Sequence, residues 1–341
     1  MNPLHTAQDF VLNFSSILWE ALPFIVLGAV VAGILEELLP QQLITRVLPK
    51  STLPAVMVGA VLGLIFPMCE CGIVVVMRRL LRKGLPLGCC IAYMLAGPIL
   101  NVVVLFSTYI AFGGLGDPNS EAQTAALRRA AVEMVLLRAG FGFIVAVVTG
   151  LIVHRLQQTR GTNALLTEVA APPKKTALSL DVVEAEPPAP PKSVWQRLQN
   201  ISETALHDFM DITVFLIIGA ALAAAAKIAI APEEIATFSR EQPYLAIPAM
   251  MLLAVIMCLC SEADAFVAAS FTQVSTSSKL AFLVLGPMLD LKLLMMYTRV
   301  FRPRLIATIV ACTVTQVFAY MMLLNLVLER AASAATAIPA P

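Results

Sequence analysis

The sequence predicts an all-α, polytopic integral membrane protein, with about eight transmembrane helices in two homologous halves. Three observations lead to this fold class. Of the 341 residues 59% are hydrophobic and only 13% are charged, and the mean hydropathy is +0.85, whereas a soluble domain has about 25% charged residues. Eight apolar segments approach the roughly 20 residues that a helix needs to cross a bilayer. A motif with helix-breaking residues also occurs twice, 189 residues apart (69 to 258).

The eight apolar segments divide evenly around a polar stretch rich in proline. The expected segments are 14–39, 53–77, 85–113, 131–154, 206–231, 243–268, 279–301 and 304–328. The first has no convincing cleavage site after it, so we interpret it as a retained helix and not a removed signal peptide. The polar stretch cannot form a packed core, and its composition is typical of a flexible linker. The expected organisation is therefore a first transmembrane repeat at 1–156, a linker at 157–200, a second repeat at 201–330 and a flexible tail at 331–341.

Basic residues predict the orientation of the chain in the membrane. Eight crossings put both termini, the linker and the turn after Arg78 and Arg79 on one side, which the positive-inside rule makes cytoplasmic. Arg299, Arg302 and Arg304 do not fit the positive-inside rule, because the same count places them outside. Four crossings in each half would make the two repeats parallel. Because this inference depends on the number of crossings, the choice between parallel and inverted repeats stays open.

The repeated motif reads Cys-x-Cys, then 25 residues, then Gly-Pro-x-x-Asn or Asp. Internal repeats with interrupted helices are the best sequence indication of a transport site in a membrane protein. We therefore expect the motif residues to bind substrate. The expected substrate-binding residues are Cys69, Glu70, Cys71, Gly97, Pro98, Asn101, Cys258, Cys260, Gly286, Pro287 and Asp290.

Each Gly-Pro pair should interrupt its helix near the middle of the bilayer, because proline lacks an N–H and glycine lowers the cost of leaving the helix. Backbone carbonyls freed at that depth are tolerated only inside protein or beside a wet cavity. Asn101 and Asp290 follow about one turn later. They either stabilise a simple proline kink or line a cavity, and the two aligned copies favour the cavity.

The cysteines of the motif are expected to be free thiols. In a regular helix two residues of a Cys-x-Cys motif point about 200° apart, so both face one ligand only if the backbone unwinds. Thiolates are ligands for soft metals and, by the same chemistry, for trivalent arsenic. The alternative is that these cysteines are small apolar core residues. The candidate metal or metalloid ligands are Cys69, Cys71, Cys258 and Cys260.

Acidic residues inside apolar segments are the sharper signal, because an intramembrane carboxylate costs several kcal/mol unless it has a function or a partner. Glu70 lies between the first two motif cysteines. Glu262, Asp264 and Asp290 lie in the second half, and we expect them to couple transport to protons or to bind a cation. The alternative is a buried structural ion pair that involves Lys292.

Several enzyme signals are absent from the sequence. There is no Gly-x-x-x-x-Gly-Lys-[Ser/Thr] phosphate loop and no His-Glu-x-x-His metal motif. We therefore expect no enzymatic activity and no cofactor. A net charge of +1 without aromatic-basic patches gives no reason to expect a nucleic-acid partner.

The segments 66–72, 78–84 and 95–101 read Phe-Pro-Met-Cys-Glu-Cys-Gly, Arg-Arg-Leu-Leu-Arg-Lys-Gly and Leu-Ala-Gly-Pro-Ile-Leu-Asn. This pattern resembles the predicted permeases of the ArsP/YraQ type, over nearly the whole chain. The resemblance implies a permease, and members of the family are associated with efflux of trivalent organoarsenicals and related proteins with export of soft metals. Glu70 and Val75 depart from the family pattern, which often has a small polar residue and a proline there.

Together these features predict an inner-membrane permease for the proton-coupled efflux of a soft metalloid or metal species or another small thiophilic solute. The resemblance alone favours export over import. Two alternatives from other classes remain: a membrane thiol–disulfide oxidoreductase, and a non-transporting membrane subunit of a larger complex. The expected partners are membrane lipid and the small-molecule or metalloid substrate, and homo-oligomerisation is left open.

Overall fold

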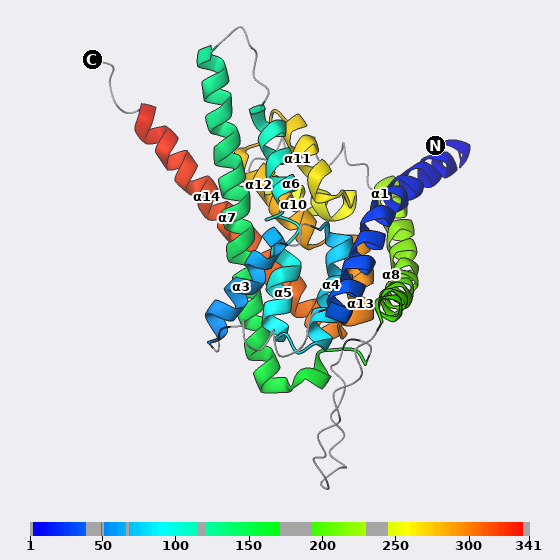
Figure 1. Cartoon of the computed structure of the whole chain (residues 1–341). Helices are drawn as coiled ribbons and strands as arrows, with labels where there is room; N and C mark the ends of the chain where they lie inside the picture. Colours follow the sequence, from blue (N-terminus) through cyan, green and yellow to red (C-terminus); the bar gives the residue numbers. More distant parts are fainter. Residues whose placement is uncertain are drawn as a thin grey trace.

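The computed structural model describes residues 3–38, 49, 51–65, 68–114, 121–168, 170, 193–229 and 245–336. These residues are almost entirely helical, and no strand occurs among them (Figure 1). Five of the described helical segments are long and apolar enough to cross a membrane: 7–37, 125–160, 195–228, 276–300 and 303–330. The predicted class, a helical membrane protein, is confirmed, whereas the expected count of eight crossing segments is not.

The described helices follow the same order of lengths twice. A long helix comes first, then four short helices, then a second long helix. The first series is α1 (Pro3–Leu38), α3 (Thr52–Ile65), α4 (Glu70–Arg82), α5 (Leu87–Ala96), α6 (Val102–Tyr109) and α7 (Glu121–Arg160). The second is α8 (Val194–Ala229), α10 (Ala246–Met257), α11 (Ser261–Ser270), α12 (Thr276–Leu285), α13 (Leu291–Val300) and α14 (Pro303–Thr336). A π-helical turn (Ile110–Gly114) extends α6, and short 3-10 turns lie at Thr162–Ala164 and Gly286–Met288.

The expected crossing at 53–77 is in fact a hairpin of α3 and α4. Gly59 and Gly63 of α3 pack against Cys89 of α5 and against Gly97, the residue that follows α5. The contacts keep the same order along both segments, so α3 and α5 run in the same direction. The turn at 83–86, where Gly84 has φ +93°, reverses the chain between α4 and α5. Because α4 is thus antiparallel to α5, it is also antiparallel to α3.

The expected crossing at 243–268 is likewise a hairpin, of α10 and α11. Lys292, in the first turn of α13, contacts the end of α10 at Cys258. Asp264, at the start of α11, lies against Gly286, where α12 ends. The end of α10, the start of α11 and the end of α12 therefore lie at one depth. Neither segment crosses the molecule, and this is why hydropathy alone overcounts the crossings.

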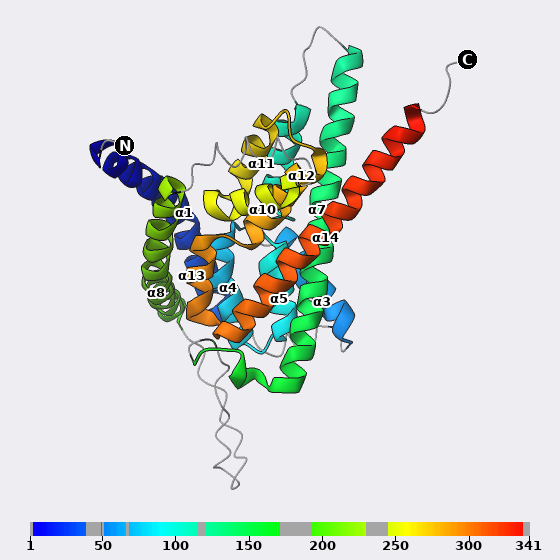
Figure 2. The same cartoon turned by 180° about the vertical axis from the view of Figure 1, so that it is seen from behind.

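The two hairpins enter from opposite ends of the molecule. Figures 1 and 2 place α3, α4, α5 and α13 at one level, and α6, α10, α11 and α12 at another. α3 begins beside the last turns of α7, where Thr52 Oγ1 lies 3.3 Å from His154 Nε2. α12 begins beside the last turns of α14, where Ser277 donates to Asn325 Oδ1 at 2.8 Å.

The helix ends correct two expectations about topology. α1 begins and α14 ends toward one end of the molecule, whereas α7 ends and α8 begins at the other (Figure 1). The start of α1 and the α7–α8 junction thus lie at opposite ends, not on one side as eight crossings require. The arginines that conflicted with that count lie at the junction end, because Arg302 Nε donates to Leu166 O at 3.0 Å and Thr167 Oγ1 to Arg299 O at 2.8 Å.

Glycines allow the central helices to approach one another closely. A Cβ at Gly72 of α4 would lie 2.8 Å from the carbonyl oxygen of Phe24 in α1, and one at Gly88 of α5 would lie 2.6 Å from the carbonyl oxygen of Gly150 in α7. Every residue of α5 is buried. Close helix contacts of this kind are typical of membrane interiors, where packing replaces the hydrophobic driving force.

Of the expected linker at 157–200, the structure describes 157–168, 170 and 193–200. Residues 157–160 belong to α7 and 194–200 to α8. Leu166 forms an antiparallel bridge with Phe301. The rest of the expected linker, and residues 337–341 of the expected tail, lie outside the described residues.

Candidate functional site

The tips of the two hairpins meet in the middle of the molecule, where the motif residues gather. Glu70, the first residue of α4, forms an ion pair with Lys292 of α13, with 2.9 Å between Oε1 and Nζ. Lys292 Nζ also lies 3.4 Å from Oδ2 of Asp290. It donates to the carbonyl oxygens of Cys258 at 3.2 Å and Leu259 at 3.4 Å. One lysine therefore connects the first hairpin, the second hairpin and the interrupted helix α12–α13.

The three side chains of this ion-pair network are buried. Glu70 and Asp290 are 1% exposed and Lys292 is 3% exposed. Lys292 lies two residues after Asp290 and is not a neighbour on a regular helix face. The pair forms because Asp290 precedes α13 in an extended conformation (φ −138°, ψ 173°). The alternative raised by the sequence, a buried ion pair that involves Lys292, thus describes this geometry, and the closest carboxylate is that of Glu70, from the other half of the sequence.

The Gly-Pro pairs interrupt their helices where the sequence places them, and the polar residue that follows caps the next helix. Asn101 Oδ1 accepts from Val103 N at 2.9 Å at the start of α6, and Asp290 Oδ1 accepts from Leu293 N at 2.7 Å at the start of α13. Such capping satisfies one of the free N–H groups at a helix start. Both capping residues and both Gly-Pro pairs are buried.

A buried arginine, Arg138 of α7, completes the charged centre and was not among the expected site residues. It donates to Thr108 Oγ1 at 2.7 Å and to the carbonyl oxygen of Ser261 at 3.0 Å. The carboxylates of Asp264 and Glu262 are its main electrostatic partners. Its position inside the apolar segment 131–154 is the signal that identifies it, since an intramembrane arginine is as costly as an acid.

Several buried polar atoms in this centre have no hydrogen-bond partner among the described residues. They include Glu70 Oε2, Asp264 Oδ2, Ser261 Oγ and Arg138 Nε. Buried polar groups in proteins are nearly always hydrogen-bonded, to protein or to water. Unpaired atoms from α4, α7 and α11 in one region are therefore consistent with a polar occupant between the hairpin tips.

The motif thiols lie at the hairpin tips. All seven cysteines are free, and six of them are buried. Cys69 is extended (φ −69°, ψ 168°) immediately before α4, which brings its thiol within hydrogen-bonding reach of Cys71. The backbone thus unwinds before Glu70 and not at Cys71-Gly72. Within the described part of the chain, no three His, Cys, Asp or Glu side chains gather as a metal-ligand group, so the four motif thiols do not form one here.

A second charged group, which we call the ionic cluster, lies at the α7–α8 junction end. It consists of Arg78, Arg79, Asp208, Asp211 and Arg299. Arg78 contacts both aspartates, with 2.6 Å to Asp211, and Arg79 Nε lies 2.6 Å from Asp208. Arg299 reaches Asp211 at 2.6 Å. The cluster ties the far ends of α4 and α13 to the middle of α8.

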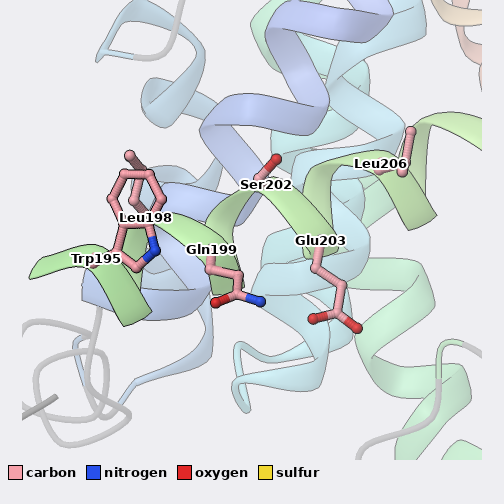
Figure 3. Close-up of a pocket in the computed structure, with 6 residues that line it drawn as sticks. All are labelled: Trp195, Leu198, Gln199, Ser202, Glu203 and Leu206. Carbon is pink, nitrogen blue, oxygen red and sulfur yellow. The ribbon is translucent and has the colours of Figure 1, made fainter. Parts of the chain in front are cut away.

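The surface also has a groove of about 730 Å³ on the first turns of α8 (Figure 3). Its lining residues are Trp195, Leu198, Gln199, Ser202, Glu203 and Leu206. They all come from one helix, and none belongs to the charged centre. The hairpin tips, and not this groove, are therefore the candidate functional site.

Comparison with known proteins gives the family. A family model described as ArsP_1, predicted permease, matches residues 6–326. The chain belongs to this family of predicted permeases. It is 34% identical over 328 residues to YcgR of Bacillus subtilis, covering 94% of this chain and 99% of the relative. No solved structure matches the chain.

Two further relatives differ in coverage. A protein of Streptococcus mutans named as a putative two-component membrane permease complex subunit is 32% identical over 313 residues, covering 92% of this chain and 93% of the relative. YraQ of Escherichia coli is 26% identical over 104 residues, or 30% of this chain and 29% of the relative. The resemblance inferred from the motif residues is therefore confirmed at the level of the family.

Proposed function

We propose that this protein is a permease that carries a small solute across the bacterial cytoplasmic membrane through the site between the two hairpin tips. The observation that supports this best is the contact of Glu70 with Lys292, which joins the two motif copies at the centre of the molecule. Interrupted helices that meet at mid-membrane and present charged groups and free backbone are the arrangement that secondary transporters use for binding.

The proposed architecture has two halves of three crossings and one re-entrant hairpin each. The crossings are α1, α5–α6 and α7 in the first half and α8, α12–α13 and α14 in the second. An odd number of crossings inverts the second half relative to the first. The hairpins that enter from opposite ends support inversion, which the sequence alone left open.

Inversion also reconciles the charges with the positive-inside rule. Arg78, Arg79, Arg299 and Arg302 all lie at the α7–α8 junction end. We therefore propose that this end faces the cytoplasm, with the linker, and that the starting end of α1 and the terminal end of α14 face outward. The earlier expectation of cytoplasmic termini followed from the count of eight crossings.

The proposed substrate is a soft metalloid or metal species, or another small thiophilic solute, because thiols from both motif copies lie at the tips. Its contacts would come from the expected substrate-binding residues. The proposed energy source is the proton gradient, with Glu262, Asp264 and Asp290 as the groups that take up and release protons. The side chains of Asp264 and Asp290 are buried and that of Glu262 is half-buried, which supports such a role.

Of the two alternatives, the oxidoreductase has less support, because the motif thiols are buried away from any partner surface. The membrane-subunit alternative draws support from the Streptococcus mutans relative, whose printed name describes a subunit of a two-component permease complex. A partner subunit is compatible with a permease site inside this chain.

The test is transport by the purified protein in liposomes, with a trivalent methylarsenical as the probe and an imposed proton gradient. We expect Asp290→Asn and Glu262→Gln to abolish the gradient-driven flux, because the amides keep the shape but cannot titrate. Asp290→Asn also keeps the cap on α13, so insertion should be unaffected.

The matched control is Glu133→Gln, at an exposed position of α7, which should transport like the wild type. Wild-type flux and pH dependence in both site variants would refute proton coupling by these residues.

A further inference from the structure

The ammonium group of Lys292 lies in a cage of four oxygen atoms. These are a carboxylate oxygen of Glu70 at 2.9 Å, the carbonyl oxygens of Cys258 at 3.2 Å and Leu259 at 3.4 Å, and a carboxylate oxygen of Asp290 at 3.4 Å. The oxygens come from three separate parts of the chain: the start of α4, the tip between α10 and α11, and the residue before α13. The cage is thus assembled by both hairpins.

The backbone of the second hairpin tip is bent to supply the two carbonyl oxygens. Cys258 has φ 47° and ψ 43°, and it is the only non-glycine with positive φ in the described part of the chain. A left-handed conformation at such a residue is strained, and it persists only where the surrounding structure enforces it. Since α10 ends at Met257 and α11 begins at Ser261, the carbonyl oxygens of Cys258 and Leu259 lie outside both helices, whereas that of Cys260 accepts from Asp264 N at 3.0 Å.

The surroundings of the cage carry more negative than positive charge. Four carboxylates, those of Glu70, Glu262, Asp264 and Asp290, face two cations, Lys292 and Arg138, in this centre. Farther out, Glu20 and Lys227 interact with one another and offset each other. A buried carboxylate is stable only with a counter-charge nearby. The cage without the lysine would therefore hold an uncompensated negative charge, which favours a replacement cation.

We propose that this cage is a binding site for a free monovalent cation of about the size of ammonium, and that Lys292 occupies it when the cation is absent. The oxygen ligands are hard donors, which suit hard cations. The distances from Nζ exceed the roughly 2.0–2.6 Å of Mg²⁺ and Ca²⁺ sites. Potassium, ammonium and alkylammonium groups are the chemistry that fits, and unwound carbonyls bind coupling cations in this way in other carriers.

Exchange between Lys292 and the free cation would give the lysine a role in the transport cycle. This consequence rests on the proposed permease function. With the cation bound, the lysine leaves the cage and releases its links to Glu70 and to the tip of the second hairpin. With the cation gone, the lysine closes the cage and neutralises it, so the empty carrier can reorient. The free cation is either a coupling ion or the positively charged part of the substrate.

The binding test uses the purified full-length chain in detergent and requires no transport. Lys292→Ala should melt at a lower temperature than the wild type, because it leaves the cage carboxylates without a counter-charge. We expect potassium or methylammonium to restore its melting temperature with a saturable concentration dependence, and choline at equal ionic strength to have no such effect. Lys292→Ala should also retain radioactive rubidium in excess over the wild type.

Two further variants keep the proposal falsifiable if Lys292→Ala folds poorly. Lys292→Met preserves the length of the side chain and should bind the same cations. The double variant Glu70→Gln/Lys292→Met removes one charge of each sign, so it should fold without added cation and should not bind rubidium. Lys279→Ala, on α12 and away from the cage, is the matched control and should resemble the wild type. Equal responses to potassium and choline in both Lys292 variants, or undiminished rubidium binding in the double variant, would overturn the proposal.

Wild-type proteoliposomes then distinguish the two sources of the cation. If a potassium gradient alone drives flux of the methylarsenical, the cage binds a coupling ion. If methylammonium itself accumulates, the cage binds the charged part of a substrate. Loss of transport in Asp290→Asn without rubidium binding by Lys292→Met would refute the cation site alone. Wild-type transport in Asp290→Asn with rubidium binding by Lys292→Met would refute the proton coupling of the proposed function alone.

Discussion

The two hairpin tips have aligned sequences but different backbones. Cys69-Glu70-Cys71-Gly72 corresponds to Cys258-Leu259-Cys260-Ser261. The helix that returns from the first tip begins at Glu70, whereas the one that returns from the second begins at Ser261, two positions later in the alignment. Among the described residues of the two tips, those of the second, Cys258 and Leu259, are the ones that direct backbone carbonyls at Lys292. Aligned motifs can thus supply complementary parts of one site: a carboxylate from one copy and carbonyls from the other.

The hairpins also differ in how their far ends are held. The far end of α4 carries Arg78 and Arg79, which the ionic cluster fixes to α8. The matching positions of α11 are Val267 and Ala268, which carry no charge. The first hairpin is therefore held by ion pairs at both its tip and its far end. The second is held at its tip by the bonds from Lys292 and Arg138 to backbone carbonyls, and its far end has no such ion pairs among the described residues. We expect the second hairpin to be the more mobile of the two.

The ionic cluster gives the largest expected effect. Asp208→Asn removes the charge that pairs with both Arg78 and Arg79, and it leaves two buried guanidinium groups short of counter-charge. Breaking a buried pair in this way typically costs about 3–5 kcal/mol. Melting of the detergent-solubilised protein should show a large drop, whereas Asp9→Asn, at an exposed position of α1, should change little. A wild-type melting temperature for Asp208→Asn would mean that the far end of α4 is not held by these ion pairs.

The close approach of α1 and α4 gives an intermediate effect. A Cβ at Gly72 would lie 2.8 Å from the carbonyl oxygen of Phe24, which is backbone and cannot swing aside. Gly72→Ala should therefore destabilise the protein by about 1–3 kcal/mol through overpacking. At Gly140 of α7 no atom lies within 4 Å of such a Cβ, so Gly140→Ala should be neutral or stabilising. Thermal melts of the two detergent-solubilised variants compare their stabilities directly. Equal melting temperatures would show that α1 and α4 can move apart without loss of stability.

Much of the central site could be predicted from the sequence, because an acid inside an apolar segment stands out. Glu70, Asp264 and Asp290 are such acids, and all three are buried. The two hairpins were not predicted, because a hydropathy window does not distinguish one long helix from two short helices that turn back. The signal that could have revealed them was the set of arginines at 299, 302 and 304, which conflicted with the count of eight crossings.

The ion pair between Glu70 and Lys292, which joins the two halves, also could not be predicted from the sequence. The repeat aligns Glu70 with Leu259 and Lys292 with Val103, so neither charged residue has a charged counterpart. Only the fold brings these two unmatched residues together. Likewise, Arg138 lies outside both motif copies, and its contact with the second hairpin depends on how α7 packs against α11.

The capping residues give the smallest and most specific comparison. Asn101 and Asp290 occupy matching positions, and each accepts a backbone N–H at the start of its helix. Asn101→Ala removes this acceptor and should cost about 1 kcal/mol, while Asn101→Ser keeps an acceptor and should cost only a few tenths. Asn101→Asp keeps the cap but introduces a carboxylate beside Val103, the counterpart of Lys292, so the new charge is buried without a partner. We therefore expect Asn101→Asp to be less stable than Asn101→Ala, although aspartate caps a helix as well as asparagine does. If Asn101→Asp melts like the wild type, the acid at this position needs no lysine, and the pairing of Asp290 with Lys292 is not what stabilises the second half.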